Sequence, residues 1–275
     1  MLKLMFAGAV AAGATTAAFA QMADQTAPAS DASAPVASTG MASDAPSWAG
    51  IYAGLHGGYG FDNGRKISNV GSTPNNAVAL SSGIRTSELG QNRSGALGGG
   101  QLGYNFQRGK LIFGGEGDFS YMDSRGTSVY RGLGVTGVAA PGRRTLVKSQ
   151  LDWMGSVRAR AGYALSDQGF VYATGGYAFG KVKGRAEFDG DSDSTVNYAG
   201  SHKYTAQGWI GGLGGEFRPF NQGVWRKISF GAEATYYDLG KSSIYALQTG
   251  TQPGFYRLGV ATRGYNGVVK INYHF

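Results

Sequence analysis

Carboxylates and guanidinium groups recur at every second position in parts of this sequence. Glu116 and Asp118 lie two residues apart, as do Arg158 and Arg160. Acids and bases that converge could carry out general acid–base catalysis. Residues at spacing two also project from one face of a β-strand, so they could instead form a wall of paired charges. We favour the wall and expect no enzyme activity, because neither a Ser-His-Asp order with an elbow motif nor paired carboxylates in a helical frame accompanies them.

Metal and cofactor chemistry has little support in the sequence. The chain has no cysteine, which excludes thiolate metal sites and disulfides. The histidines, His56, His202 and His274, are dispersed without the spacing of metal ligands. Residues 98–103 fit the G-x-G-x-x-G pattern of dinucleotide-binding turns, but these glycines lie inside an alternating segment rather than before a helix. We therefore expect no cofactor and no metal site.

Residues 189–194 (Asp-Gly-Asp-Ser-Asp-Ser) are the best candidate for a calcium-binding loop. Ser194 stands at the sixth position, where such a loop needs glycine, and Gly200 stands at the twelfth, where it needs a bidentate glutamate. A solvated loop is the simpler interpretation.

The charged residues lie in segments that alternate between apolar and polar side chains. In the last of these, Ile271, Tyr273 and Phe275 share one face, while Lys270 and Asn272 share the other. Alternation with period two predicts strands that have one apolar face. We predict eight strands, over residues 48–61, 95–107, 111–122, 151–165, 169–182, 204–217, 228–239 and 259–275.

The connections between these strands are long and short in turn. Residues 62–93 form the first long connection, and residues 107–110 form the first short turn. No run of about eighteen apolar residues could cross a membrane as a helix. An even number of strands with short turns on one side and long loops on the other is typical of outer-membrane barrels. We therefore predict an all-β fold, an eight-stranded antiparallel up-and-down transmembrane β-barrel with short periplasmic turns and long extracellular loops.

In such a barrel the polar face of each strand turns inward, into a lumen just wide enough for side chains. Charges that are crowded there must pair, because an isolated buried charge is very costly. We expect them to form one network that plugs the lumen. On an open sheet, the same residues would simply be solvated. The predicted lumen network consists of Glu116, Asp118, Arg158, Arg160, Glu216, Glu233 and Lys270.

Several strand segments resemble a known family. The clearest are Trp-Ala-Gly-Ile-Tyr-Ala-Gly from Trp48, Gly-Gln-Leu-Gly-Tyr-Asn-Phe from Gly100, and Leu-Asp-Trp-Met-Gly-Ser-Val-Arg-Ala-Arg-Ala-Gly-Tyr from Leu151. These are similar to the small porin-like, immunodominant outer-membrane proteins of alphaproteobacteria, which share the OmpA-type barrel. The resemblance implies a location in the bacterial outer membrane. It also implies that the terminal strand and its last residue, Phe275, are the signal that the barrel assembly machinery reads.

The amino-terminal residues predict export. Lys3 precedes a small-residue apolar stretch, and Ala18-Phe19-Ala20 fits a signal-peptidase site. The next residues are almost wholly Ala, Ser, Thr, Pro, Asp and Gln, a composition that cannot form a packed core. We predict a signal peptide over residues 1–20, a disordered periplasmic leader over 21–47 and the barrel domain over 48–275.

The chain carries a formal net charge of +8, and much of its basic charge falls in the predicted outer loops. Such loops would meet the anionic phosphates of lipopolysaccharide, which is a simpler account of the charge than nucleic-acid binding. We therefore expect outer-membrane lipid and lipopolysaccharide as partners and no nucleic acid. The loop residues that we expect to face lipopolysaccharide are Arg65, Lys66, Arg85, Arg93, Arg125, Arg131, Arg143 and Arg144.

Three functions fit these patterns. The first is a structural outer-membrane protein of the cell envelope with surface-exposed loops. The second is a narrow porin-like channel for ions or small solutes. The third is a surface receptor or adhesin for a host or surface ligand, for which the sequence indicates no definite residues.

Overall fold

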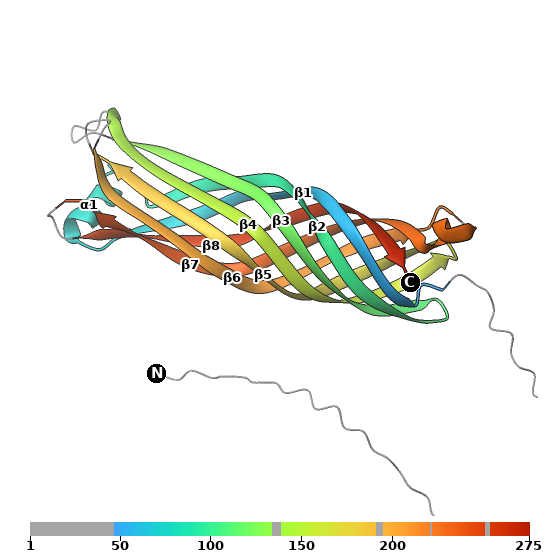
Figure 1. Cartoon of the computed structure of the whole chain (residues 1–275). Helices are drawn as coiled ribbons and strands as arrows, with labels where there is room; N and C mark the ends of the chain where they lie inside the picture. The colour runs from blue at the N-terminus through green and yellow to red at the C-terminus, as the bar shows by residue number, and fades with distance from the viewer. Residues whose placement is uncertain (1–46, 134–138, 191–194, 221, 251–253) are drawn as a thin grey trace, which may run out of the picture. The chain divides into compact units, whose positions relative to one another are not determined.

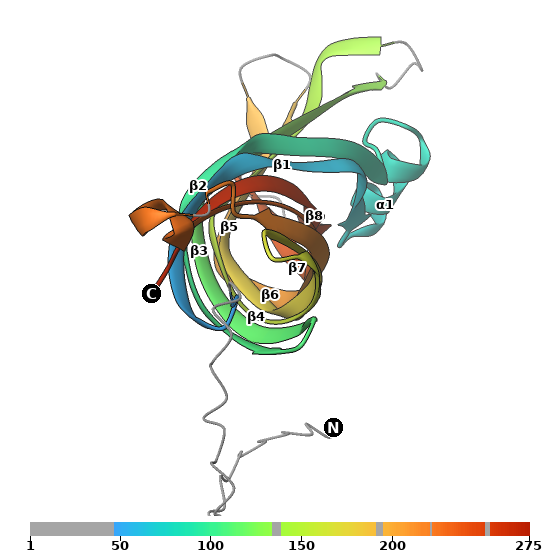
Figure 2. The ribbon, with the colours of Figure 1, turned by 90° about the vertical axis from the view of Figure 1, so that its right-hand side faces the viewer.

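The computed structural model describes residues 47–133, 139–190, 195–220, 222–250 and 254–275. The predicted signal peptide and nearly all of the predicted leader lie outside these residues. The part of the chain from residue 47 onward forms one ring of eight antiparallel strands, in which β1 pairs with both β2 and β8 (Figures 1 and 2). The predicted eight-stranded antiparallel barrel is confirmed.

The strands follow one another around the ring in sequence order. Their bounds are β1 Gly50–Gly71, β2 Glu88–Arg108, β3 Leu111–Leu133, β4 Ala139–Ser166, β5 Gly169–Asp189, β6 Val196–Phe217, β7 Ile228–Gln248 and β8 Phe255–His274.

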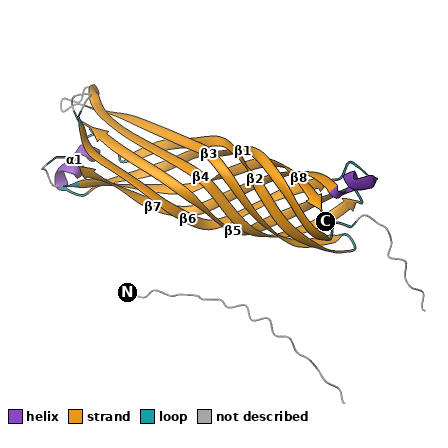
Figure 3. Cartoon of the chain, in the orientation of Figure 1, coloured by secondary structure: helices purple, strands orange, loops and turns teal. Residues whose placement is uncertain are grey.

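Two short helices lie at opposite ends of the barrel (Figure 3). The helix α1 (Pro74–Ser81) follows β1, and the hydroxyl of Thr73 caps it by accepting a hydrogen bond from the Asn76 amide. The 3-10 helix η1 (Gly223–Lys227) lies between β6 and β7, at the end that also holds the C-terminus. Among the described residues, no helix has both the length and the apolar character needed to cross a membrane.

The strands extend well beyond their predicted ends on the α1 side. Residues 62–71 and 88–93, which we expected in a long loop, continue β1 and β2, and β3 to β7 are extended in the same way. The prediction relied on apolar residues that face outward. In the extensions many apolar residues, such as Ile67 and Leu89, face inward and are buried, while the outward face is mostly polar with a few exposed apolar side chains such as Leu247.

On some strands a local bulge lies where the apolar residues change from the outer face to the inner face. The pairing register shifts between Leu151 and Trp153 on β4, and Leu151 is buried although strict alternation with Trp153 would turn it outward. Asp152 pairs with Lys183 at 2.7 Å, and the Lys183 side chain is 41% exposed. An extra residue in a strand turns every later side chain to the opposite face, so a strictly alternating pattern could not locate it.

The outer surface between the extensions and the turns is a belt of apolar and aromatic side chains. Trp209 is 55% exposed, and the Phe119 and Trp153 rings lie 5.6 Å apart across β3 and β4. Trp48 does not belong to this belt and is fully buried inside the barrel. It packs 4.6 Å from Phe170, with the Arg218 guanidinium 3.9 Å from its ring.

The interior is filled in layers, which can be followed along β4. Starting from the end with the tight turns, its buried side chains include Ala164, then Arg160, Arg158 and Ser156, then Met154 and Leu151. Ser149 and Val147 follow toward α1. Three buried apolar clusters accordingly lie at three heights, one with Trp48 and Phe170, one with Met154 and Leu151, and one with Val147 and Phe188. The charged residues lie between the first and the second.

Candidate functional site

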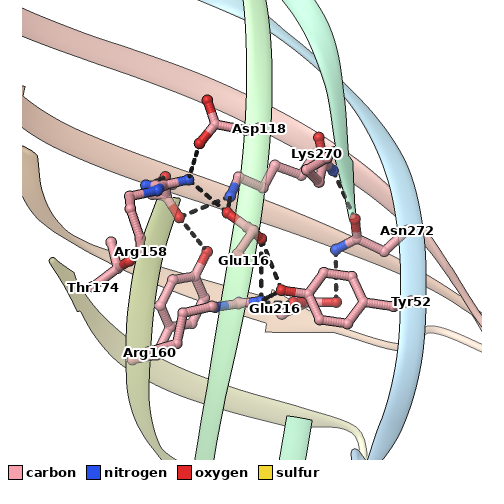
Figure 4. Close-up of polar contacts among 12 residues, drawn as sticks. Tyr52, Glu116, Asp118, Arg158, Arg160, Thr174, Glu216, Lys270 and Asn272 are labelled. Carbon is pink, nitrogen blue, oxygen red and sulfur yellow. Dashed lines mark hydrogen bonds and ion pairs between the residues drawn. The ribbon is translucent and has the colours of Figure 1, made fainter. Parts of the chain in front are cut away.

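Arg158 is at the centre of the interior charges. It lies directly opposite Glu116 in the β3–β4 ladder, so that the backbone register alone brings the two side chains together. Its guanidinium contacts Glu116 at 2.5 Å, Glu233 at 2.6 Å and Asp118 at 3.1 Å. One arginine thus connects carboxylates from β3 and β7 across the lumen (Figure 4).

Lys270 and Arg160 extend this cluster to the other walls. The Lys270 ammonium lies 2.9 Å from Glu116 and 2.8 Å from Glu233. Arg160 lies 3.3 Å from Glu116 and 3.2 Å from Glu216. The structure therefore brings all seven predicted lumen residues into one connected network, which we call the interior charge network.

Residues that sequence reasoning did not assign complete this network. The Tyr52 hydroxyl donates to Glu116 at 2.9 Å, and the Tyr172 hydroxyl donates to Glu233 at 2.8 Å. The Tyr172 ring lies 3.8 Å from the Arg160 guanidinium, a cation–π contact. The alternation of side chains along the first strand predicts that Tyr52 points inward. It does not predict which residue the Tyr52 hydroxyl contacts.

Three further side chains contact Glu216. It accepts hydrogen bonds from Ser229 at 2.5 Å and from Asn272 at 2.8 Å, and His274 lies 3.1 Å away. These residues lie at the barrel end where the chain terminates, and they link β6, β7 and β8.

Two glycines provide the space for the network tyrosines. Gly103 lies directly opposite Tyr52, and Gly214 lies directly opposite Tyr172. A Cβ atom at either glycine would collide with the facing phenol ring. Gly103 is also the last glycine of the G-x-G-x-x-G pattern, which lies inside β2, so these glycines serve close packing of strands and side chains.

The geometry favours structural ion pairing over acid–base chemistry. The side chains of Glu116, Glu216 and Glu233 are at most 2% exposed, and each is held by at least one cation and one further donor. A carboxylate with its lone pairs occupied by fixed donors is stabilised as a charge and has no access to a substrate.

The three histidines contact different neighbours and do not lie together. His56 hydrogen-bonds to Gln101 and Ser120, His274 contacts Ser229 and Glu216, and the His202 ring stacks on Tyr204. Within the described residues there is no group of three or more metal-ligating side chains. Residues 191–194 of the calcium-loop candidate lie outside the described part of the chain.

The structure places three of the predicted outer basic residues inside the barrel. Arg65, Arg85 and Arg93 are at most 6% exposed, so their side chains do not face an external lipid layer. Arg65 and Arg93 lie on strand extensions, where the inward face holds them. Arg85 lies between α1 and β2 and donates to the carbonyl oxygens of Arg144 (2.9 Å) and Asp189.

Arg65 and Arg93 form a second polar layer above the interior charge network. Arg65 donates to Gln91 at 2.5 Å and to Ser149 at 2.7 Å, and both arginines lie 3.7 Å from Asp62.

The remaining predicted outer bases lie on strands rather than in loops. Lys66 pairs with Glu88 at 2.8 Å, and Arg125 pairs with Asp123 at 2.7 Å. Arg144 pairs with Asp189 at 2.7 Å. Arg131 is exposed and Arg143 is partly buried.

Phe275 closes the last strand. Its amide donates to the Ile51 carbonyl at 3.0 Å, its side chain is 70% exposed, and its ring meets Tyr273 edge-on at 5.2 Å. The terminal aromatic therefore projects from the outer surface where β8 meets β1.

Proteins with similar sequences are outer-membrane proteins. Residues 7–263 match the family described as outer membrane protein beta-barrel domain. The 31 kDa outer-membrane immunogenic protein of Brucella melitensis is 34% identical over 214 residues, which is 77% of this chain and 80% of that protein. The 25 kDa outer-membrane immunogenic protein of Brucella canis is 31% identical over 168 residues, covering 61% of this chain and 57% of that protein.

The fold also occurs among solved structures. The outer membrane protein OprG from Pseudomonas aeruginosa aligns with a TM-score of 0.51 at 10% identity, over 82% of this chain and 96% of that chain. Together with the match over residues 7–263, this shows that the chain belongs to the outer membrane protein beta-barrel domain family and is a β-barrel protein of the bacterial outer membrane.

Proposed function

We propose that this protein is a closed structural barrel of the outer membrane, which holds its shape through a filled interior. The observation that supports this most directly is the succession of layers inside the ring. The interior charge network lies between apolar clusters, and the layer of Arg65 and Arg93 lies between the second cluster and the third. Conduction would require several independent layers to move.

A narrow channel is the second candidate, and the interior disfavours it. The cavity beside Asp118, Arg158 and Lys270 has a volume of about 20 Å³, which is room for about one water molecule. Removing a single network residue would enlarge that cavity, while the apolar layer of Leu151 and Met154 stays in place. We therefore expect that loss of Arg158 weakens the barrel without opening it.

A non-enzymatic role follows from the same geometry. The buried acids are each bound to fixed cations, so none is free to exchange protons with a substrate. The named relatives are outer-membrane immunogenic proteins, which is in keeping with this role.

Cysteine accessibility tests the closed interior, because the chain has no cysteine of its own. Ser149 and Ser229 are buried at two depths, at 3% and 0% exposure. In the refolded barrel, S149C and S229C should both resist a small charged methanethiosulfonate, and both should react after unfolding in urea. S72C, at an exposed position beside α1, is the control that should react at once. Rapid reaction of S149C and S229C in the folded barrel would show a water-filled interior and overturn the proposal.

We also propose that Phe275 is part of the signal for the barrel assembly machinery. Its exposed ring at the β8–β1 seam supports this, because it is available to a partner before closure. Deleting Phe275 should leave more protein in the periplasm and less in the outer membrane, as measured by fractionation and by heat-modifiable migration in gels. Phe220 is an aromatic residue outside any strand that is 43% exposed, and replacing it with Ala is the control. Equal membrane fractions for the two variants would argue against the signal.

For the chain before the barrel, we propose that residues 1–20 direct export and are removed, and that residues 21–47 remain as a periplasmic leader. N-terminal sequencing of the protein from isolated outer membranes should begin at Gln21. A sequence that begins at Met1 would contradict this.

A further inference from the structure

The outer wall of β3 to β6 carries two rows of basic side chains above the aromatic belt. Direct cross-strand pairing places Arg125 opposite Gln150, Gln150 opposite Lys183, and Lys183 opposite Lys203. The second row lies two residues farther from the aromatic belt. It consists of Thr127, Lys148, Arg185 and Ser201, each opposite the next on the neighbouring strand. These residues line a groove of about 390 Å³, which we call the basic groove.

This arrangement is unfavourable without a counter-charge. Lys148 directly faces Arg185, and Lys183 directly faces Lys203. Side chains that face each other on neighbouring strands lie about 5 Å apart, and like charges in such pairs destabilise a sheet. An anion that sits between the rows would relieve both repulsions at once.

Carboxylates along the groove neutralise only part of this charge. Asp152 pairs with Lys183 at 2.7 Å, Asp123 pairs with Arg125 at 2.7 Å, and Glu187 pairs with Arg185. Among the residues that the structure describes, Lys148 and Lys203 are exposed and contact no carboxylate. The groove therefore keeps an excess of positive charge that is centred on these two lysines.

The distance of the basic groove from the aromatic belt indicates the kind of anion that it meets. Gln150 lies three residues before Trp153, a residue of the aromatic belt, on β4. At about 3.3 Å per residue, the rows begin roughly 10 Å farther along the tilted strand. Headgroup layers extend about 5–8 Å beyond the hydrocarbon on each side of a bilayer. The basic groove thus lies at headgroup depth, on the side of the barrel that carries α1 (Figure 1).

We propose that the basic groove binds the phosphate-bearing saccharide headgroup of an outer-leaflet glycolipid. Four neighbouring strands at about 4.8 Å spacing make each row about 14 Å wide, so the groove can hold more than one phosphate. The apolar belt below takes the acyl chains, and Lys148 and Lys203 bind phosphate oxygens. This site rests on the placement in the outer membrane, but it does not require the barrel to be closed.

The experiment measures binding of diphosphorylated lipid A to the refolded full chain in neutral detergent, by native mass spectrometry. Lys148→Gln with Lys203→Gln should weaken binding at least tenfold. Lys241→Gln with Arg257→Gln is the matched control, because it removes the same charge from exposed positions on β7 and β8. This control should bind as the wild type does. Equal affinity of wild type and the Lys148/Lys203 variant would overturn the proposal.

Three further measurements make the result specific. Lys203→Glu places an acid opposite Lys183, so it should fold at least as well as wild type and bind lipid A still more weakly. Dephosphorylated lipid A should bind wild type at least tenfold more weakly than the diphosphorylated form, and equal binding would overturn the role of phosphate. Groove-dependent binding of inositol hexakisphosphate without binding of lipid A would assign the site to a soluble polyphosphate and overturn the headgroup assignment. If the barrel conducted ions but still bound lipid A through the groove, the closed-barrel proposal would be refuted and the basic-groove proposal would stand.

Discussion

At the scale of single residues, the barrel depends on charges that cannot reach water. Arg158 contacts three carboxylates, while Lys270 bridges two of them. The sequence could predict which charged residues point inward, because the spacing of two places them on one face. It could not predict that the Tyr52 and Tyr172 hydroxyls complete the network, because those contacts depend on how far each side chain reaches across the lumen.

Removing Arg158 should be strongly destabilising. Arg158→Ala leaves Glu116 and Glu233 with only Lys270 as a shared cation, in a site almost without solvent. We expect a loss of about 3 kcal/mol in the free energy of unfolding. Urea titration of the barrel refolded in lipid vesicles measures it.

The control is Lys66→Ala, which breaks the exposed pair with Glu88 and should cost about 0.5 kcal/mol or less. If the two variants unfolded at the same urea concentration, the interior charge network would contribute no more than a surface ion pair.

At the scale of elements, the strands change character along their length. Near the tight turns, apolar side chains such as Leu102 face outward, while beyond the aromatic belt apolar side chains such as Ile67 face inward. The sequence predicted the first part of each strand, because outward apolar residues alternate with inward polar ones. It missed the extensions, since their apolar face is the inner one and bulges such as that before Trp153 interrupt the alternation.

Gly214 on β6 leaves the space in which the Tyr172 side chain of the neighbouring strand reaches the interior charge network. In Gly214→Ala, the new Cβ would displace the Tyr172 ring from Arg160 and Glu233. We expect a loss of about 2 kcal/mol in the free energy of unfolding, which is typical of overpacking. In a Tyr172→Ala background the same change should cost much less, because the ring is gone.

Gly267→Ala provides the control for Gly214. Gly267 is an exposed strand residue with no atom near its would-be Cβ, so the change should be within about 0.5 kcal/mol of wild type. If Gly214→Ala cost as much without Tyr172 as with it, the glycine would serve the backbone alone.

At the scale of the whole molecule, the barrel has a filled interior and two different outer surfaces. The apolar belt suits the hydrocarbon core of a membrane, and the strand extensions beyond it carry the basic groove. The sequence predicted the barrel and its membrane location. It did not predict that basic residues divide between an inner layer with Arg65 and an outer wall with Lys148, because bulges and cross-strand register decide that division.

Single-channel recording of the refolded protein in planar bilayers tests the closed barrel most directly. We expect no stepwise ion conductance from the wild type. We also expect none from Arg158→Ala, because the apolar layers around Leu151 and Val147 remain in place when the guanidinium is removed. Reproducible current steps from the wild type would show that water and ions cross the interior, and they would contradict the closed structural barrel.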